Sequence, residues 1–426
     1  MRQFVKLLIW LFFCIVFIDI GSALADAESQ FSRGQLFYEK ELYGAAILQF
    51  NRFLDTYPDD ARHSVAVLNI GKSHFYRRDY EQAEKRLQKL WQEDRTPYFN
   101  KYIDDLFSYL IETKIILGKI EEADQLTQGY TLRYWVTSAY TEILFRMAEA
   151  WYMAGDFSRA NRYLIRMEER KAEPPHPVYI AYLKGIIGIA QDDRESIEKY
   201  FKRVLDSPIS IHNKPEEIVM LKDQARLKLA EFYFQQGEFY PALDSYASIK
   251  SWELLGDRRY LGMAWSHFMV LEYEKTVDYA KKLIDQYPQS IYLGEAEFLQ
   301  GVCYLDMEDP IFAVERFENF FRLIADFDSE AKILGIEAQI AEEREKSEEM
   351  NNEIRDLEEA LVYLSSGDAD RMMSRILRKK EQIEMIERGV AKIEQRLDQR
   401  KTELQLKVEA EYGLSKAKLL STHSNE

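Results

Sequence analysis

A tripeptide at residues 71–73, Gly-Lys-Ser, comes closest in this chain to a motif that performs chemistry, because the same three residues end a phosphate-binding loop. That loop needs a further glycine five residues upstream, and this position holds Ala66. It also needs a preceding β-strand, whereas Val67, Ile70 and His74 share one face of an expected helix. The sequence therefore gives no support for a nucleotide cofactor.

Residues able to ligate a metal or act as a nucleophile are scattered rather than grouped. The histidines form no H-E-x-x-H pair, and the chain has only two cysteines, Cys14 and Cys303. No G-x-S-x-G elbow or EF-hand loop is present. Neighbouring carboxylates are frequent, as expected on the solvated faces of acidic helices. We therefore predict no catalytic residue, no metal site and no cofactor. The histidines are His63, His74, His176, His212, His267 and His423.

The stretch Leu227–Ile249 carries the pattern on which the rest of the chain is built. Its apolar residues recur at helical spacing in two runs, with Gly237 between them. A glycine here permits the positive φ angle that ends a helix and reverses the chain. Two helices joined by so short a turn must lie antiparallel and cover each other's apolar faces. The runs are Leu227, Leu229, Ala230, Tyr233 and Phe234, then Phe239, Ala242, Leu243, Tyr246 and Ile249.

The same pattern recurs along the chain at intervals of 34 to 45 residues. A small residue marks the second helix of most copies, and another small residue usually stands twelve positions earlier. One helical hairpin cannot bury its apolar face alone, so the copies must stack, and we expect about eight of them. The second-helix positions are Ala46, Ala83, Ala123, Ala160, Ile197, Ala242, Thr276 and Ala313; the earlier positions are Gly34, Gly71, Ile111, Ala148, Gly185, Ala230, Ala264 and Gly301.

This pattern resembles the tetratricopeptide repeat, a helical hairpin of about 34 residues. The resemblance implies an all-α solenoid whose concave groove holds a peptide or a segment of a partner protein. Together with the N-terminal leader described below, the repeats resemble those of exported, cell-envelope members of the family in bacteria. The positions that carry it best are Gly34, Ala46, Gly71, Ala83, Ala148, Ala160, Ala230, Ala242, Gly301 and Ala313.

Composition limits the classes of partner. The chain has 426 residues, of which 46% are hydrophobic and 31% charged, with a formal net charge of -16. A solenoid reaches this length readily because each repeat contacts only its neighbours. The negative charge argues against a nucleic-acid partner, since no net basic field would displace counterions from phosphates.

The first 25 residues have the anatomy of a secretory signal peptide. Arg2 and Lys6 precede an apolar run that ends at Ile18, and Ala23-Leu24-Ala25 is a cleavage site of the A-x-A type. An uncleaved anchor is the alternative, but the run is shorter than the roughly 20 residues that a spanning helix needs. Cleavage would leave a single cysteine, which suits an exported protein of the bacterial periplasm.

Aromatic residues are concentrated between residues 130 and 145. Tyr130, Tyr134, Trp135 and Tyr140 could contact a partner on the concave face. The alternative is that these bulky side chains fill the space between repeats. Both interpretations remain open at this point.

The periodicity changes after residue 328, where apolar residues alternate in steps of three and four, the heptad pattern of a coiled coil. Glu343 and Ser347 interrupt the first series, and residues 365–368 separate two helices. The first series is Ile333, Ile336, Ile340, Met350, Ile354, Leu357, Leu361 and Leu364; the second is Met372, Ile376, Ile383, Ile386, Val390, Ile393, Leu397 and Leu404.

The two series carry opposite charge. Eleven acids and four bases lie between Glu330 and Glu359, whereas ten bases and five acids lie between Arg371 and Lys401. Opposite charges beside two seams favour an antiparallel hairpin within one chain, and a parallel dimer is the alternative. The end of the second arm, Leu404–Leu420, should fold back against the last repeats or overhang them.

We therefore expect a signal peptide at residues 1–25, a solenoid at 26–328, a coiled-coil hairpin at 329–420 and a disordered tail at 421–426. The predicted function is a non-enzymatic periplasmic scaffold for protein–protein interaction in a cell-envelope assembly, motility or secretion complex. The alternative is a component of polysaccharide export, or one that binds glycan or peptidoglycan. The expected partner is a protein or peptide in the concave groove, not a nucleic acid. The chain is not expected to be an integral membrane protein, and association with a membrane through its partners is left open. The sequence decides neither the identity of the partner nor the oligomeric state.

Overall fold

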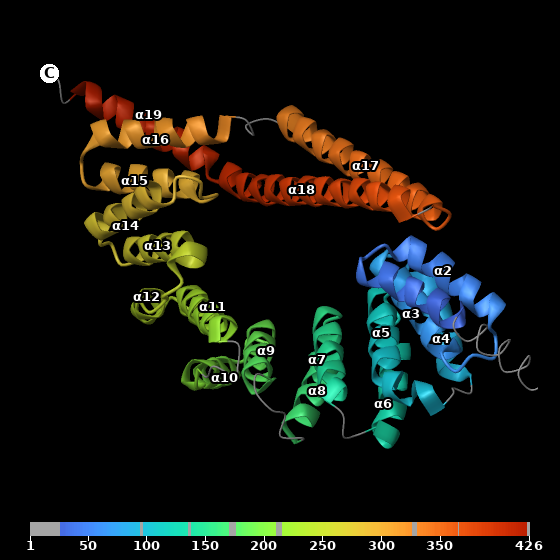
Figure 1. Ribbon diagram of the computed structural model, residues 1–426. Coiled ribbons are helices and arrows are strands. Elements are labelled where there is room, and N and C mark those ends of the chain that lie inside the picture. The colour runs from blue at the N-terminus through green and yellow to red at the C-terminus, as the bar shows by residue number, and fades with distance from the viewer. Residues whose placement is uncertain are drawn as a thin grey trace, which may run out of the picture. The chain divides into compact units, whose positions relative to one another are not determined.

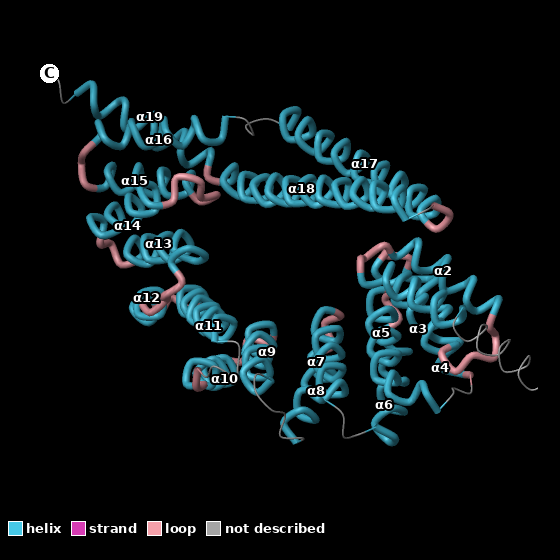
Figure 2. Tube along the Cα trace, viewed as in Figure 1, coloured by secondary structure: helices cyan, strands magenta, loops and turns pink. Residues whose placement is uncertain are grey.

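The computed structural model describes residues 26–93, 97–134, 138–169, 176–209, 215–325, 330–364 and 366–423. Within these ranges the secondary structure is helical and contains no strand (Figures 1 and 2). The prediction of an all-α fold is confirmed. The residues of the expected signal peptide lie outside the described part of the chain.

The helices follow one another with short connections. After a helical segment at residues 26–39 come α2 (Tyr43–Thr56), α3 (His63–Tyr76), α4 (Tyr80–Gln92), the 3-10 helix η1 (Pro97–Tyr102), α5 (Ile103–Ile116), α6 (Ile120–Tyr134), α7 (Ser138–Met153), α8 (Phe157–Glu169), α9 (His176–Ala190), α10 (Arg194–Asp206), α11 (Pro215–Gln235), α12 (Phe239–Ala247), α13 (Trp252–Met269), α14 (Tyr273–Gln286), α15 (Leu293–Asp306), α16 (Pro310–Ile324), α17 (Glu330–Leu361), α18 (Ser366–Gln405) and α19 (Lys407–His423).

The described helices up to α16 form eight consecutive hairpins, which we call the repeat hairpins. The first pairs residues 26–39 with α2, and the last pairs α15 with α16. The second-helix positions read from the sequence have no exposed surface in any of the eight: Ala46, Ala83, Ala123, Ala160, Ile197, Ala242, Thr276 and Ala313 are all 0% exposed. This burial is consistent with the small side chain found at most of these positions.

The turn inside each repeat hairpin contains one residue with a positive φ angle. Gly237 has φ 76°, which confirms the turn predicted for it. Gly118 and Gly155 occupy the same place in two other hairpins, whereas five hairpins use a residue with a side chain. The turn residues of those five hairpins are Glu41, Arg78, Asp192, Leu271 and Glu308, with φ between 52° and 62°. Glycine is therefore favoured but not required at this turn.

The small residues of the first helices make room for a ring or large apolar side chain of the second. A Cβ atom on Gly34 would lie 2.7 Å from the ring of Phe50, and one on Gly301 would lie 2.8 Å from the ring of Phe317. Carbon atoms do not approach so closely without displacement, so glycine at these positions permits the ring to pack on the helix backbone.

Two compact units are present in the described chain. Unit 1 contains the described residues up to Met167 together with Glu348–Glu384, and unit 2 contains Glu168–Ser347 together with Met385–Glu426. Each unit thus combines consecutive repeat hairpins with one part of α17 and α18. We call α17 and α18 the C-terminal hairpin, residues 348–384 its tip, and residues 330–347 with 385–405 its base.

One series of buried residues in each arm of the C-terminal hairpin follows a seven-residue spacing. Along α17 they include Ile340, Ser347, Ile354 and Leu361, and along α18 they include Ile376, Ile383, Val390 and Leu397. Ser347, which the sequence analysis places between two parts of the seam, is only 7% exposed and belongs to this series. The serine hydroxyl is small enough to be accommodated where a larger polar side chain would not be.

Ion pairs between the two arms define an antiparallel register. In the base, Lys401 lies 2.8 Å from Glu337 and Arg344 lies 2.5 Å from Glu394. In the tip, Lys380 lies 3.3 Å from Glu358. The oppositely charged flanks recognised in the sequence therefore face each other within one chain.

The last helix, α19, returns to the repeat hairpins of unit 2. Ala410 and Ala417 are buried against Phe317, Phe320 and Ile324 of α16. The expected return of the chain end is therefore confirmed. The tail expected to be disordered at residues 421–426 needs correction, because residues 421–423 belong to α19; residues 424–426 lie outside the described part.

Candidate protein-interaction surface

Four tyrosines gather on the first three repeat hairpins of unit 1. Tyr38 ends the helical segment at residues 26–39, Tyr43 begins α2, Tyr76 ends α3 and Tyr109 lies in α5. Together with Lys72 of α3 they form what we call the tyrosine surface. Three of the four tyrosines, Tyr38, Tyr76 and Tyr109, lie on first helices of repeat hairpins.

The rings contact one another in a continuous chain. The rings of Tyr43 and Tyr76 stack with their centroids 5.0 Å apart and an interplanar angle of 12°. Tyr38 packs edge-on against both, at 5.7 Å from Tyr43 and 6.3 Å from Tyr76. Tyr109 lies 5.9 Å from Tyr76, and their hydroxyl oxygens are 2.5 Å apart. Edge-on and stacked arrangements at these distances are favourable for aromatic pairs, so the rings hold one another in place.

Lys72 joins the tyrosines from the middle of α3. Its Nζ lies 5.5 Å from the ring centroid of Tyr38 and 4.8 Å from that of Tyr109. It also donates a hydrogen bond of 3.0 Å to the carboxylate of Asp105. A cation held over two ring faces is attracted by their quadrupoles, which fixes both rings relative to α3.

Burial keeps the tyrosine hydroxyls protonated. The pKa of Tyr43 is raised to about 12, mainly by burial. The nearby side chains of Glu41, Tyr76 and Glu358 add smaller contributions. Burial also raises the pKa of Tyr38 and Tyr109 above the ordinary value, with the neighbouring tyrosines adding to the effect. The hydroxyls of Tyr38, Tyr43 and Tyr109 are therefore protonated at physiological pH.

The surface is open to solvent as well as ordered. Tyr76 is 45% exposed although its ring is stacked on Tyr43 and touches Tyr109. Tyrosine presents a large apolar face and a polar tip at a low entropic cost, which is why it is enriched where proteins bind one another. The arrangement can thus bind a ligand by contact and hydrogen bonding, and it contains no nucleophile.

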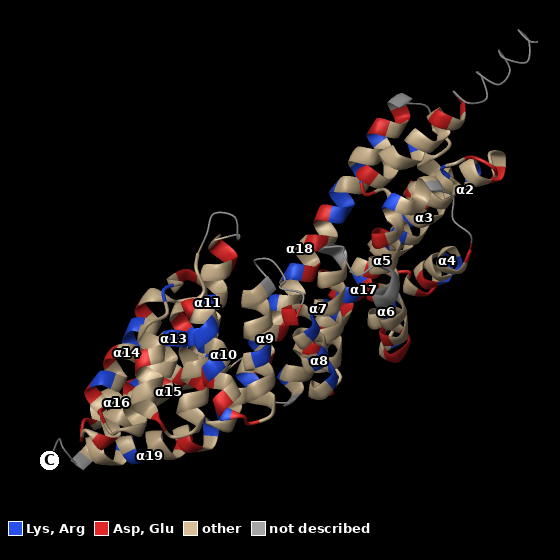
Figure 3. Ribbon diagram, turned by 90° about the horizontal axis from the view of Figure 1, so that it is seen from below, with Lys and Arg blue, Asp and Glu red and all other residues tan. Residues whose placement is uncertain are grey.

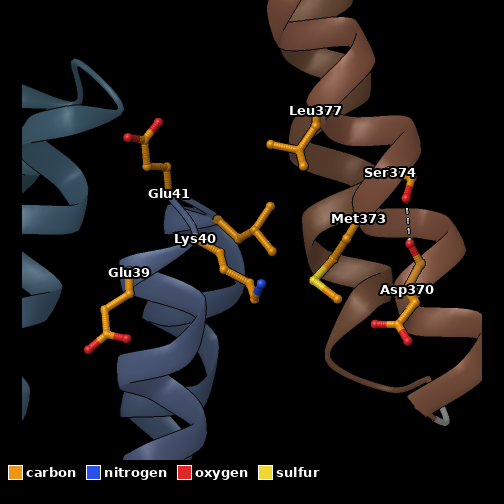
Figure 4. A pocket seen from close by; sticks show the side chains of 8 residues that line it. Glu39, Lys40, Glu41, Asp370, Met373, Ser374 and Leu377 are labelled. Carbon is orange, nitrogen blue, oxygen red and sulfur yellow. Dashed lines mark hydrogen bonds between the residues drawn. The ribbon is translucent and has the colours of Figure 1, made fainter.

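An open hollow lies next to the tyrosine surface within unit 1. The turn of the first repeat hairpin and the first turns of α18 face each other across it (Figure 4). Its walls are Glu39, Lys40, Glu41 and Leu42 on one side and Asp370, Met373, Ser374 and Leu377 on the other. Lys380 lies one turn further along α18, with its Nζ 5.6 Å from the ring centroid of Tyr43.

The predicted site residues fall into two groups, those that the structure shows to be buried and those outside the described part of the chain. The ten repeat positions from Gly34 to Ala313 are buried in the repeat hairpins, as their small size requires. Tyr140, predicted as a possible partner contact, is 1% exposed, so its ring fills the interior and the packing interpretation holds for it. Trp135 and the side chains of Tyr130 and Tyr134 lie outside the described part.

The sequence analysis missed the tyrosine surface although a signal was available. Tyr38, Tyr76 and Tyr109 occur 38 and 33 residues apart, close to the repeat length. The tripeptide at residues 71–73 lies inside α3, which confirms that it does not form a phosphate-binding loop. Its lysine contributes to the tyrosine surface instead.

The described residues offer few competing sites. They contain no group of three or more His, Cys, Asp or Glu side chains that could hold a metal ion. In the same ranges, no helix is both long and apolar enough to cross a membrane. Acidic and basic side chains both occur along the helices of the repeat hairpins (Figure 3).

A family model described as "Tetratricopeptide repeat" matches residues 260–290. This range covers most of α13 and all of α14, the hairpin that follows the template stretch Leu227–Ile249. In it Thr276 takes the place of the usual alanine and is 0% exposed. No protein with a curated description matches the chain.

Several solved structures resemble the chain at low identity. A tetratricopeptide repeat protein from Parabacteroides merdae is 16% identical, with 60% of this chain and 91% of that chain covered and a TM-score of 0.39. The C-terminal part of a repeat-containing protein from Cytophaga hutchinsonii is 15% identical, with 72% and 98% covered and a TM-score of 0.42. The TPR2AB domain of yeast Sti1, solved in complex with an Hsp90 peptide, is 12% identical, with 70% and 90% covered and a TM-score of 0.22. The match to the tetratricopeptide repeat at residues 260–290 thus lies within a run of eight helical hairpins in the described part of the chain.

Proposed function

We propose that this protein is a non-enzymatic scaffold of the bacterial cell envelope, and that the tyrosine surface of its first three repeat hairpins binds a protein partner. The observation that supports the proposal is the ordered and partly exposed group of Tyr38, Tyr43, Tyr76 and Tyr109 around Lys72. These residues are brought together from three consecutive hairpins and make no catalytic arrangement.

The chemistry of the surface favours a peptide segment over a small molecule. Its rings spread over several helices instead of enclosing a deep pocket, and Tyr76 remains 45% exposed. A peptide can lay apolar side chains on the ring faces while its backbone carbonyls accept hydrogen bonds from tyrosine hydroxyls. The positive charge of Lys72 is offset by Asp105, so the surface does not select for a strongly acidic ligand.

The glycan-binding alternative loses Tyr140, one of the four aromatic residues proposed as partner contacts. Within the aromatic stretch at residues 130–145, Tyr140 is buried and does not present its ring to a ligand. Binding of a glycan to the tyrosine surface is therefore kept as an outcome of the test below, not as a second proposal.

A photoreactive residue at position 76 tests the proposal. A Tyr76→benzoylphenylalanine variant, irradiated in cells of the source bacterium, should give one defined protein adduct, because the ring at this position faces solvent. The matched control is Lys89→benzoylphenylalanine in the last turn of α4, a residue outside the tyrosine surface whose side chain is 71% exposed. The same adduct at both positions, no adduct at position 76, or adducts of glycan only would contradict the proposal.

Export is proposed from the leader at residues 1–25 and is tested separately. The mature protein should begin at Asp26 and should be released by osmotic shock. N-terminal mass spectrometry decides this, and recovery of intact Met1 in the membrane fraction would overturn it.

A further inference from the structure

The first repeat hairpin differs from the others at the start of its second helix. The residue at the N-cap of α2 is Leu42, whose side chain cannot accept a hydrogen bond from the backbone. Six of the other seven hairpins have an acidic residue here, and three of those accept a backbone hydrogen bond. The six are Asp79, Asp156, Asp193, Glu238, Glu272 and Asp309, and Lys119 is the remaining one. The start of α2 is thus left uncapped by its own sequence.

The tip of the C-terminal hairpin supplies the missing acceptor. Glu358 of α17 accepts a hydrogen bond of 2.7 Å from the backbone N–H of Gly44, in the first turn of α2. Its side chain is almost fully enclosed, with only 3% of the residue exposed, and Lys380 of α18 neutralises it at 3.3 Å. A carboxylate at a helix N-terminus is favoured by both the free N–H groups and the helix dipole.

Gly44 is matched to this contact. A Cβ atom at this position would lie 2.5 Å from the Glu358 carboxylate oxygen, so a residue with a side chain would displace it. No other repeat hairpin has glycine at the equivalent place, which is occupied by Glu81, Glu121, Ser158, Glu195, Tyr240, Glu274 and Ile311. The first hairpin therefore differs from the others at two positions, Leu42 and Gly44, and both differences favour capping of α2 by Glu358.

Further contacts between tip and first hairpins surround this centre. Lys380 donates a hydrogen bond of 2.5 Å to the carbonyl of Glu41, the turn residue with positive φ. The guanidinium of Arg52 lies 4.4 Å from the ring centroid of Tyr363, and that of Arg355 lies 4.0 Å from the carboxylate of Asp79. These are single polar contacts at partly exposed positions, and they suit a docked segment.

We propose that the hairpin tip is a latch, which docks on the first repeat hairpin by capping α2 with Glu358 and thereby positions Tyr43 for partner binding. Tyr43 directly precedes Gly44 in α2, its ring stacks on Tyr76, and Lys380 of the docked tip lies 5.6 Å from it. The docked tip leaves Tyr76 exposed, so docking supports the tyrosine surface instead of covering it. This role in partner binding rests on the proposed function, whereas the latch itself does not.

Hydrogen exchange tests the latch directly in the full chain. Gly44→Ala should expel the carboxylate, and Glu358→Ala should remove it while the sequence of α2 is unchanged. Both variants should speed amide exchange about tenfold or more in residues 42–46 and in the tip around residue 358, given the usual strength of a hydrogen bond to a charged group. Exchange in the base, at residues 385–405, should not change.

Matched controls separate undocking from a general effect of substitution. Glu359→Ala changes the exposed neighbour of Glu358 on the same helix, and Gly129→Ala adds a Cβ atom where nothing lies within 4 Å. Neither should alter exchange at residues 42–46 or in the tip. Unchanged exchange in both Gly44→Ala and Glu358→Ala would overturn the latch, and so would equal changes in the controls.

The effect on partner binding is measured with the photoreactive residue at position 76. In the Glu358→Ala background the adduct should fall several-fold, while the Glu359→Ala background should retain it. An undiminished adduct with an open latch would overturn the positioning of Tyr43. If the parent protein gives no adduct at all, the proposed function and the role in partner binding fail together, and hydrogen exchange still decides the latch.

Discussion

The C-terminal hairpin contacts repeat hairpins in both units, and the two contacts use the same device with different surroundings. In unit 1, Glu358 of the tip lies over Gly44 at the start of α2. In unit 2, Glu403 of the base lies over Gly294 at the start of α15. Neither helix has a capping side chain of its own, because the N-cap residues are Leu42 and Tyr292.

The surroundings make the base contact part of the core and the tip contact a docking site. Glu403 is 0% exposed and pairs with Arg400, itself 2% exposed, and α19 covers the neighbouring helix α16. Glu358 pairs with Lys380, whose side chain is 30% exposed. A carboxylate that caps a helix from outside can therefore act as an integral support or as a detachable contact, depending on how completely its cation is removed from water.

The largest effect is expected at the base. Glu403→Ala would leave the Arg400 guanidinium buried without its partner, and breaking one side of a buried ion pair typically costs about 3–5 kcal/mol. Chemical denaturation followed by circular dichroism measures the loss. A cost below about 1 kcal/mol would show that Arg400 reaches solvent, and the comparison with the tip would then lose its basis.

A smaller loss is expected at the tip. Glu358→Ala removes one charge-assisted hydrogen bond and leaves Lys380 able to turn toward water, so we expect about 1–2 kcal/mol. The same denaturation experiment measures it, with Glu359→Ala as the control that should stay within about 0.5 kcal/mol of the parent. Equal losses for Glu358→Ala and Glu403→Ala would remove the distinction between the two contacts.

A smaller effect than either deletion is expected on the pH dependence of stability, to which the contact between Glu403 and α15 should contribute. Burial raises the pKa of Glu403 and of its neighbour Glu295, so the native state retains protons that the unfolded chain has released. The free energy of unfolding should therefore fall as the pH rises above about 4.5, the ordinary value for a glutamate. Glu403→Gln should flatten this dependence. A slope that is the same in parent and variant would assign the effect to other groups.

The last prediction concerns the pairing of the two arms and is tested by crosslinking instead of by stability. In a Cys303→Ser background, Ile354→Cys with Ile383→Cys should oxidise to an internally bridged monomer, because both residues are buried in the antiparallel seam of unit 1. Leu357→Cys alone should remain unlinked. Ready crosslinking of the single variant, without an internal bridge in the double one, would favour a parallel dimer.

The sequence by itself determined the elements of this protein, because their signals are local. Helical spacing and a glycine at residue 237 define the hairpin, and the eight small or branched positions from Ala46 to Ala313 are all fully buried. The opposite charges of α17 and α18 are likewise a local signal, because the excess of acids or bases can be counted within each helix. An apolar stripe that will be buried can be recognised from the spacing of apolar residues within about 15 positions.

The tertiary structure alone decided which residues from distant parts of the chain meet. Glu358 is one of many acids in α17, and only the approach of Gly44, 314 positions earlier in the sequence, makes it a helix cap. The same holds for Tyr38, Tyr76 and Tyr109, whose rings touch because three hairpins stack, and for Tyr140, whose burial depends on its neighbours. A capping carboxylate or a stacked ring is defined by its partner in space, and one residue type in a helical pattern does not specify that partner.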